Sequence, residues 1–161
     1  MSARKIIALA IAGYWLAHCS MAGAQDEMYW ESNFGPITLA SIAQRSETPE
    51  GSSTARLILT GDVSLSADNS TGARLTEPGG DYLVTEYALE FDGDGQSATG
   101  REDVSYTSYG SFISTHVTIT KVGADSDVVV TLNVRAFMNV GDVADASSYA
   151  ATQTLTASWA G

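Results

Sequence analysis

Cysteine and basic residues are scarce in this 161-residue chain. The first scarcity excludes an internal disulfide, and the second argues against anionic partners. The single cysteine, Cys19, cannot form a disulfide within one copy, so no such bond can staple the core. Eight lysines and arginines stand against 19 aspartates and glutamates, which gives a net charge of −11. Nucleic acid and anionic membrane surfaces are therefore poor partners, because both repel an acidic protein.

Histidine is almost as rare, and no residue pattern names a reaction. Only His18 and His116 are present, so a Ser/His/Asp site or a histidine-based zinc site outside the N-terminal segment would have to use His116. Glu86 and Glu90 would share one face of a strand, but at about 3.3 Å per residue they stand about 13 Å apart, too far for glycosidase chemistry. We therefore predict that the protein is not an enzyme and has no obligatory cofactor.

The first 24 residues have the parts of a secretory signal peptide. Basic residues 4–5 precede an apolar run over residues 6–16, and small residues 22–24 come directly before the polar Gln25. The apolar run is too short to span a bilayer comfortably. We expect residues 1–24 to be a helical signal peptide that is cleaved after Ala24. The protein would then be secreted, periplasmic or on the cell surface, with no membrane insertion after cleavage.

Cleavage after Ala24 would leave 137 residues, enough for a single domain over residues 25–161. It would remove two of the eight basic residues and none of the acidic ones, so the net charge would fall to −13. Lipidation of Cys19 is the alternative, although His18 stands where a lipobox has a small residue.

Alternation of apolar and polar residues predicts an all-β domain. The most regular stretches cover residues 82–91 and 128–140, and residues 56–65 alternate as well. Gly61 interrupts the last of these and marks a bulge or a close backbone approach. Further strands are predicted over residues 37–44, 104–109 and 112–122, while residues 47–54, 67–81 and 92–103 have loop composition. Such short strands favour an antiparallel β-sandwich.

Residues 149–159 (YAATQTLTASW) form the strand around which we expect the domain to be organised. Tyr149 and Trp159 stand at the two ends of its apolar side. We expect this strand to be central to one sheet, to neighbour residues 128–140 and to bury Trp159. Five core residues are predicted to be strongly buried: Leu59, Leu89, Leu132, Val134 and Leu155.

The loop over residues 92–103 (DGDGQSATGRED) is a candidate calcium site. Asp92, Asp94 and Asp103 fall at the first, third and twelfth positions of a twelve-residue calcium loop. The sixth position, which should be glycine, is Ser97. The alternative is a β-turn in which acidic residues stand beside glycines.

The end of the chain, a tyrosine after a small-residue loop and then alternating threonines and apolar residues, resembles that of spore-coat-protein-U-like domains and chaperone–usher pilins. Phe34-Gly35 and residues 82–91 (YLVTEYALEF) follow the same plan. The resemblance implies an immunoglobulin-like sandwich of about seven strands, built into a surface fibre by insertion of a neighbour's N-terminal strand. Two departures are the missing paired cysteines and an N-terminal arm from Gln25 that is short and irregular for a donor strand.

Three hypotheses follow. The leading one is an exported, non-enzymatic structural or adhesive surface protein, a pilin-like fibre subunit whose partners are other subunits, through strand exchange, and a periplasmic chaperone. The alternative is a small carbohydrate- or calcium-binding module that uses Tyr106, Tyr109 and the loop over residues 92–103. The third is a hydrolase that depends on Glu86, Glu90 or His116.

Overall fold

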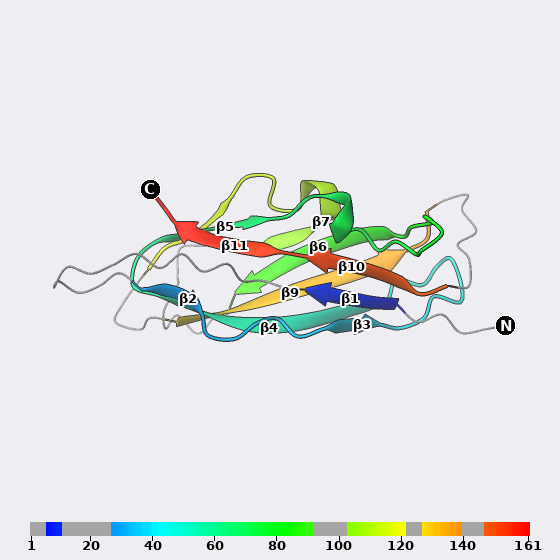
Figure 1. Cartoon of the computed structure of the whole chain (residues 1–161), viewed down its shortest axis with the longest axis horizontal. Helices are drawn as coiled ribbons and strands as arrows, with labels where there is room; N and C mark the ends of the chain where they lie inside the picture. The colour runs from blue at the N-terminus through cyan, green and yellow to red at the C-terminus, as the bar shows by residue number, and fades with distance from the viewer. Residues whose placement is uncertain (1–5, 11–26, 92–102, 122–126, 140–146) are drawn as a thin grey trace.

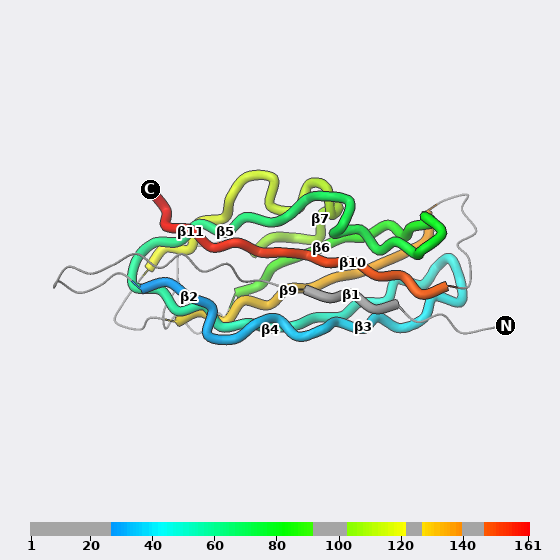
Figure 2. The backbone as a smooth tube through the Cα atoms, viewed as in Figure 1, coloured from blue at the N-terminus to red at the C-terminus, as the bar shows by residue number. Residues whose placement is uncertain are grey.

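The computed structural model describes residues 27–91, 103–121, 127–139 and 147–161 (Figures 1 and 2), together with the strand backbone of residues 6–10 (Figure 1). This part of the chain is mostly β, with two short 3-10 helices and no α-helix, which confirms the all-β prediction. The strands are β1 (Ile6–Ala10), β2 (Met28–Trp30), β3 (Ile37–Leu39), β4 (Glu50–Leu59), β5 (Val63–Ala67), β6 (Val84–Phe91), β7 (Val104–Ser108), β8 (Val117–Ile119), β9 (Asp127–Phe137), β10 (Tyr149–Gln153) and β11 (Leu155–Trp159). The 3-10 helices are η1 (Thr71–Ala73) and η2 (Tyr109–Ser111).

The strands form one larger and two smaller sheets. The larger sheet has the order β2-β4-β9-β6-β7 and is antiparallel throughout. The smaller sheets have the orders β10-β1-β3 and β11-β5-β8, and β1 with β10 is the one parallel pair among the described strands. Only Thr154 separates β10 from β11, so the chain passes directly from one small sheet to the other (Figure 1).

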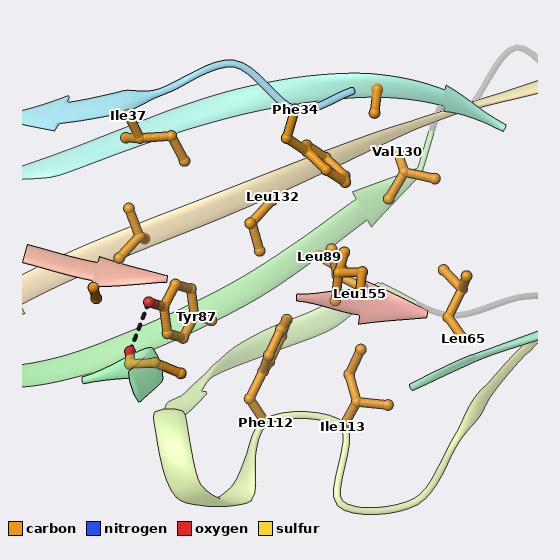
Figure 3. Packing of buried hydrophobic residues seen from close by; sticks show 14 of the residues in the cluster. Phe34, Ile37, Leu65, Tyr87, Leu89, Phe112, Ile113, Val130, Leu132 and Leu155 are labelled. Carbon is orange, nitrogen blue, oxygen red and sulfur yellow. Dashed lines mark hydrogen bonds between the residues drawn. The ribbon is translucent and has the colours of Figure 1, made fainter. Parts of the chain in front are cut away.

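All three sheets contribute to one cluster of buried apolar side chains (Figure 3). Strand β9 lies between β4 and β6 and buries every second residue, as its alternation predicts. The five predicted core residues are all at most 1% exposed, which confirms the predicted strand faces. They are Leu59, Leu89, Leu132, Val134 and Leu155.

Tyr87 places a hydroxyl group inside this apolar cluster, and that hydroxyl has a hydrogen-bond partner. Its ring packs on Phe112 with the centroids 5.4 Å apart, and its hydroxyl donates to the carbonyl of Ala73 at 2.7 Å (Figure 3). Burial raises the pKa of the Tyr87 phenol above its ordinary value, so the hydroxyl keeps its proton and continues to donate. Phe112 lies directly after η2, outside any strand. Of the described residues in the predicted strand over residues 112–122, only Val117–Ile119 form a strand.

The predicted strand over residues 56–65 is two strands, β4 and β5. A Cβ atom at Gly61, between them, would lie 3.3 Å from the ring of Trp159, so a side chain rather than another backbone segment lies close to this glycine. At its other end β4 begins at Glu50, inside the segment predicted to be a loop. Pairing with β9, which extends to Glu50 opposite Arg135, overrides the local loop composition.

The prediction of one central strand over residues 149–159 is wrong. Its two halves, β10 and β11, are each the edge of a small sheet, and the neighbour of β11 is β5 rather than β9. Both edges of β9 are already taken, by β4 and β6. Trp159 is 42% exposed because it lies at the end of an edge strand, where it covers Gly61 instead of entering the core.

The N-terminal segment also differs from its prediction. Residues 6–10 form the strand β1 rather than part of a helix, and the other residues of the predicted signal peptide lie outside the described ranges. Within the described ranges, no helix has the length and apolar character needed to cross a membrane.

Core packing gives a direct test. Leu132→Ala should lower the free energy of unfolding by about 2 to 5 kcal/mol, because Leu132 is fully buried at the centre of β9 and its removal leaves a cavity. Thr131→Ala, on the other face of the same strand, should change it by less than about 1 kcal/mol. Urea unfolding of both variants measures the difference, and equal losses would show that the faces of β9 are misassigned.

Candidate strand-binding site

Strand β1 fills a gap between β3 and β10 and joins two strands that do not pair with each other (Figure 1). It runs parallel to β10 and antiparallel to β3, and residue 6 stands opposite both Tyr149 and Leu39. At about 4.8 Å per strand spacing, the two walls stand about 9.6 Å apart, room for one strand. We call this gap the β3–β10 site. Because β1 lies within the predicted signal peptide, cleavage after Ala24 would detach it from the domain.

The first wall, β3, is held against β4 by a glycine. Ile37 and Leu39 are buried while Thr38 is exposed, so one face of β3 points into the core. A Cβ atom at Gly51 would lie 2.6 Å from Ile37 Cγ2 and 2.9 Å from Leu39 Cδ2. The glycine therefore lets both side chains lie directly on β4, and this packing does not involve β1.

The second wall, β10, is held from its far edge. The Ala150 N–H donates to the carbonyl of Thr76 at 3.1 Å, and the Thr76 N–H donates back to the Ala150 carbonyl at 3.0 Å. Successive residues of a strand direct their backbone groups to opposite edges, so the groups of Tyr149 and Ala151 face the β3–β10 site. The side chains of Tyr149, Ala151 and Gln153 are buried beneath this edge.

Gln153 fixes the end of β10, where the chain changes sheet. Its Nε2 donates to the carbonyls of Asp68 at 3.0 Å and Thr154 at 3.2 Å, and the Asp68 N–H donates to the Thr154 carbonyl at 2.9 Å. A polar side chain that is only 2% exposed would be costly here without these bonds. Its Oε1 has no hydrogen-bond partner among the described residues.

Two separately anchored walls with facing backbone groups can bind an extended peptide as an added strand. Main-chain hydrogen bonds would supply part of the affinity, and the side chains that point inward would supply specificity. An inserted residue opposite Ala151 and Ile37 would lie on the buried face, because neighbouring residues of paired strands share a side of the sheet. The site therefore favours a peptide with apolar residues at alternate positions.

Only one of the three predicted calcium ligands, Asp103, lies among the described residues. Asp92 and Asp94 lie outside them, and Asp103 lies directly before β7. The Asp103 Oδ1 accepts a hydrogen bond from the Phe91 N–H at 3.2 Å, so this carboxylate joins the end of β6 to the start of β7. Across the described ranges, no group of three or more His, Cys, Asp or Glu residues could hold a metal ion. Calcium binding stays a prediction.

Among the predicted hydrolase residues, Glu86 and Glu90 lie on the same strand, whereas His116 lies outside any strand. Glu86, on β6, accepts a hydrogen bond from Arg135 Nε at 2.6 Å and forms an ion pair with it. The Arg135 guanidinium also lies over the ring of Tyr106, 4.2 Å from its centroid. Glu90 is exposed on β6, and His116 is exposed directly before β8 in one of the small sheets.

Tyr109 lies in a small pocket that the sequence did not predict. The pocket has a volume of about 220 Å³, and the Arg74 guanidinium lies over the Tyr82 ring at 3.8 Å and near the Tyr109 ring at 5.9 Å. Arg74 forms no ion pair with any described residue. Arg74 comes from the predicted loop over residues 67–81 and Tyr82 from the start of the predicted strand over residues 82–91. Periodicity in the sequence gives no sign that these two side chains lie together.

No protein-family model matches this chain, and no curated protein matches it either. Function must therefore rest on the β3–β10 site, on the pocket at Arg74 and on the sequence itself.

The anchoring of β3 by Gly51 can be tested. Gly51→Ala should destabilise the protein by about 1 to 3 kcal/mol, because the added methyl group overlaps Ile37 and Leu39 and forces β3 away from β4. Gly110→Ala is the control, since a Cβ atom there meets nothing within 4 Å. Urea unfolding should place the Gly51→Ala midpoint clearly below that of Gly110→Ala. Indistinguishable midpoints would mean that β3 does not depend on this contact.

Proposed function

We propose that this protein is an exported, non-enzymatic structural protein of the cell surface, assembled into a fibre-like complex by accepting a strand into the β3–β10 site. The observation that carries the proposal is that residues 6–10, which are predicted to be removed on export, complete a sheet whose other strands belong to the mature domain. Removal of β1 would leave facing edges of β3 and β10 without backbone partners, and exposed edges of this kind recruit other strands.

The proposed architecture is an immunoglobulin-like β-sandwich. The five-stranded sheet forms one layer, and the two small sheets, joined through β10 and β11, form the other. The single buried cluster and the resemblance to chaperone–usher pilins both support this arrangement. In such a sandwich the β3–β10 site is a missing strand of the second layer.

Retention of the N-terminal fragment tests the proposal. A protease site inserted after Ala24 in the full chain, expressed without export, would allow β1 to be cut from the folded domain. We expect the fragment of residues 1–24 to stay bound after cleavage, because its strand pairs with both walls. Its removal should lower the melting temperature by several degrees, since a bound ligand in 100-fold excess over its Kd stabilises a protein by about 2.7 kcal/mol.

Size-exclusion chromatography with mass spectrometry would show whether the fragment co-elutes, and calorimetry would measure the melting temperature. A fragment that separates at once, with an unchanged melt, would sink the strand-acceptor function. Gly51→Ala should weaken retention more than Gly110→Ala, because only the former disturbs a wall of the site.

The pocket at Arg74 supports a second candidate function, binding of an acidic saccharide. A guanidinium with no ion pair among the described residues offers a forked donor to a carboxylate, and it lies over the partly exposed ring of Tyr82, which holds it in place. The volume of about 220 Å³ suits one sugar ring rather than a larger ligand.

Calorimetric titration with glucuronate tests this second candidate. We expect binding that weakens at least tenfold in Tyr82→Ala, which removes the ring that holds the Arg74 guanidinium in place, and that does not occur with uncharged glucose. Tyr29→Ala is the matched control, because Tyr29 is similarly exposed but lies on β2, outside the pocket. Equal heats for glucuronate and glucose, or no heat for either, would remove this function.

A further inference from the structure

We propose that the start of the mature chain is not available as a donor strand, so the strand that fills the β3–β10 site comes from a different protein rather than from the N-terminus of a second copy. This inference rests on the proposed function and adds the identity of the donor. It follows from the contacts of the segment that would begin the mature chain.

The start of the mature chain is bound along its own β4. Strand β2 pairs Met28–Trp30 with residues 57–59 of β4. Before it, the Glu27 N–H donates to Thr60 Oγ1 at 2.7 Å, and the Thr60 N–H donates to the Glu27 carbonyl at 3.0 Å. The segment is thus hydrogen-bonded to the rest of the domain from its first described residue, and it is a strand from Met28.

The same attachment continues beyond β2. The Glu31 N–H donates to the Arg56 carbonyl at 2.9 Å, and the Arg56 N–H donates to Ser32 Oγ at 2.9 Å. Further along, the Gly35 N–H donates to Ser53 Oγ at 2.8 Å. These bonds hold the chain against β4 until β3 begins.

Side chains reinforce this attachment. Trp30 packs on the buried Phe34 with the ring centroids 5.5 Å apart. Arg56 forms an ion pair with Glu31 at 3.4 Å. If residues 27–35 left β4 to act as a donor strand for a neighbouring molecule, these contacts and the β2–β4 ladder would be broken.

Too little chain remains ahead of this segment to form a donor strand. After cleavage behind Ala24 only Gln25 and Asp26 precede Glu27. Two residues reach about 7 Å at full extension, whereas β1 pairs five residues with β10. Both residues are polar, which does not suit the buried face of the site.

The charge of the mature chain also acts against its own second copy. With six basic and 19 acidic residues, each copy would carry a net charge of −13 and would repel another at low salt. The donor is therefore a different protein that presents an extended segment, apolar at alternate positions and parallel to β10. A chain that only accepts a strand would stand at the end of any fibre built in this way.

Competition for the cleaved complex tests the inference. The probe is the complex between the fragment of residues 1–24, carrying a fluorophore, and the domain of residues 25–161. A synthetic peptide of residues 4–12 should displace the labelled fragment. A peptide of residues 25–35, the start of the mature chain, should fail to displace it even at 100-fold higher concentration. Displacement by the second peptide would overturn the inference.

A disulfide lock gives a second, independent test. Tyr29 of β2 stands directly opposite Ile58 of β4, and the mature chain has no other cysteine, so Tyr29→Cys with Ile58→Cys would fix β2 in place. We expect sedimentation velocity to show a monomer after release of the fragment, with or without the lock, and unchanged affinity for the peptide of residues 4–12. Oligomers that form only in the reduced protein would show that the segment over residues 25–35 is a donor.

The two proposals fail in different ways. If the fragment of residues 1–24 does not bind the domain, the strand-acceptor function is wrong and this inference falls with it. If the fragment binds but the peptide of residues 25–35 replaces it, the acceptor function stands and only the identity of the donor is wrong.

Discussion

Backbone groups at the inner edges of β3 and β10 need partners that neither strand can give the other, since a whole strand width separates them. The other ladders of the described residues are formed by strands that lie after residue 27, and β9 is paired along both edges. At the β3–β10 site the partner is a segment that the sequence predicts to be removed. The arrangement of the small sheet that contains β3 and β10 therefore depends on whatever strand lies between them.

The walls of this site are anchored without the strand between them. Gly51 lets β3 lie directly on β4, and Thr76 pairs with β10 from its far side. Gln153 ties the end of β10 to the end of β5 through the carbonyl of Asp68. Loss of the middle strand would then expose edges and apolar surface without removing the supports that position them. Such preorganisation lowers the ordering cost of binding a new strand.

Alternation in the sequence predicted what depends on local periodicity. The faces of β6 and β9, and with them the burial of Leu89, Leu132 and Val134, follow from the period of two. It could not predict which strands become neighbours. Residues 149–159 read as one amphipathic strand, but their two halves pair with β1 and β5, and Trp159 stays partly exposed because the partner strand ends beside it.

The sites that the sequence predicted and those that the structure shows barely overlap, for a physical reason. Motif spacing identifies ligands that are close along the chain, as with Asp92, Asp94 and Asp103, whereas the β3–β10 site is made of backbone edges from segments more than 100 residues apart. Arg74, Tyr82 and Tyr109 come from three segments outside the named strands and likewise lie together only in the folded chain. Amino-acid composition does not indicate contacts between residues that are distant in the sequence.

The apolar run over residues 6–16 is suited both to an export signal and to a strand between β3 and β10. The sequence alone does not distinguish these two roles. An export signal requires an apolar segment of about this length, and a strand that lies between β3 and β10 requires apolar residues on its buried face. In the proposed function the two roles follow each other. While the chain is uncleaved, the segment can protect the edges of β3 and β10 from aggregation, and cleavage after export would open the site in the compartment that holds its partner. The same apolar segment would therefore direct export and block the β3–β10 site. The domain could accept another strand only after this segment has been removed.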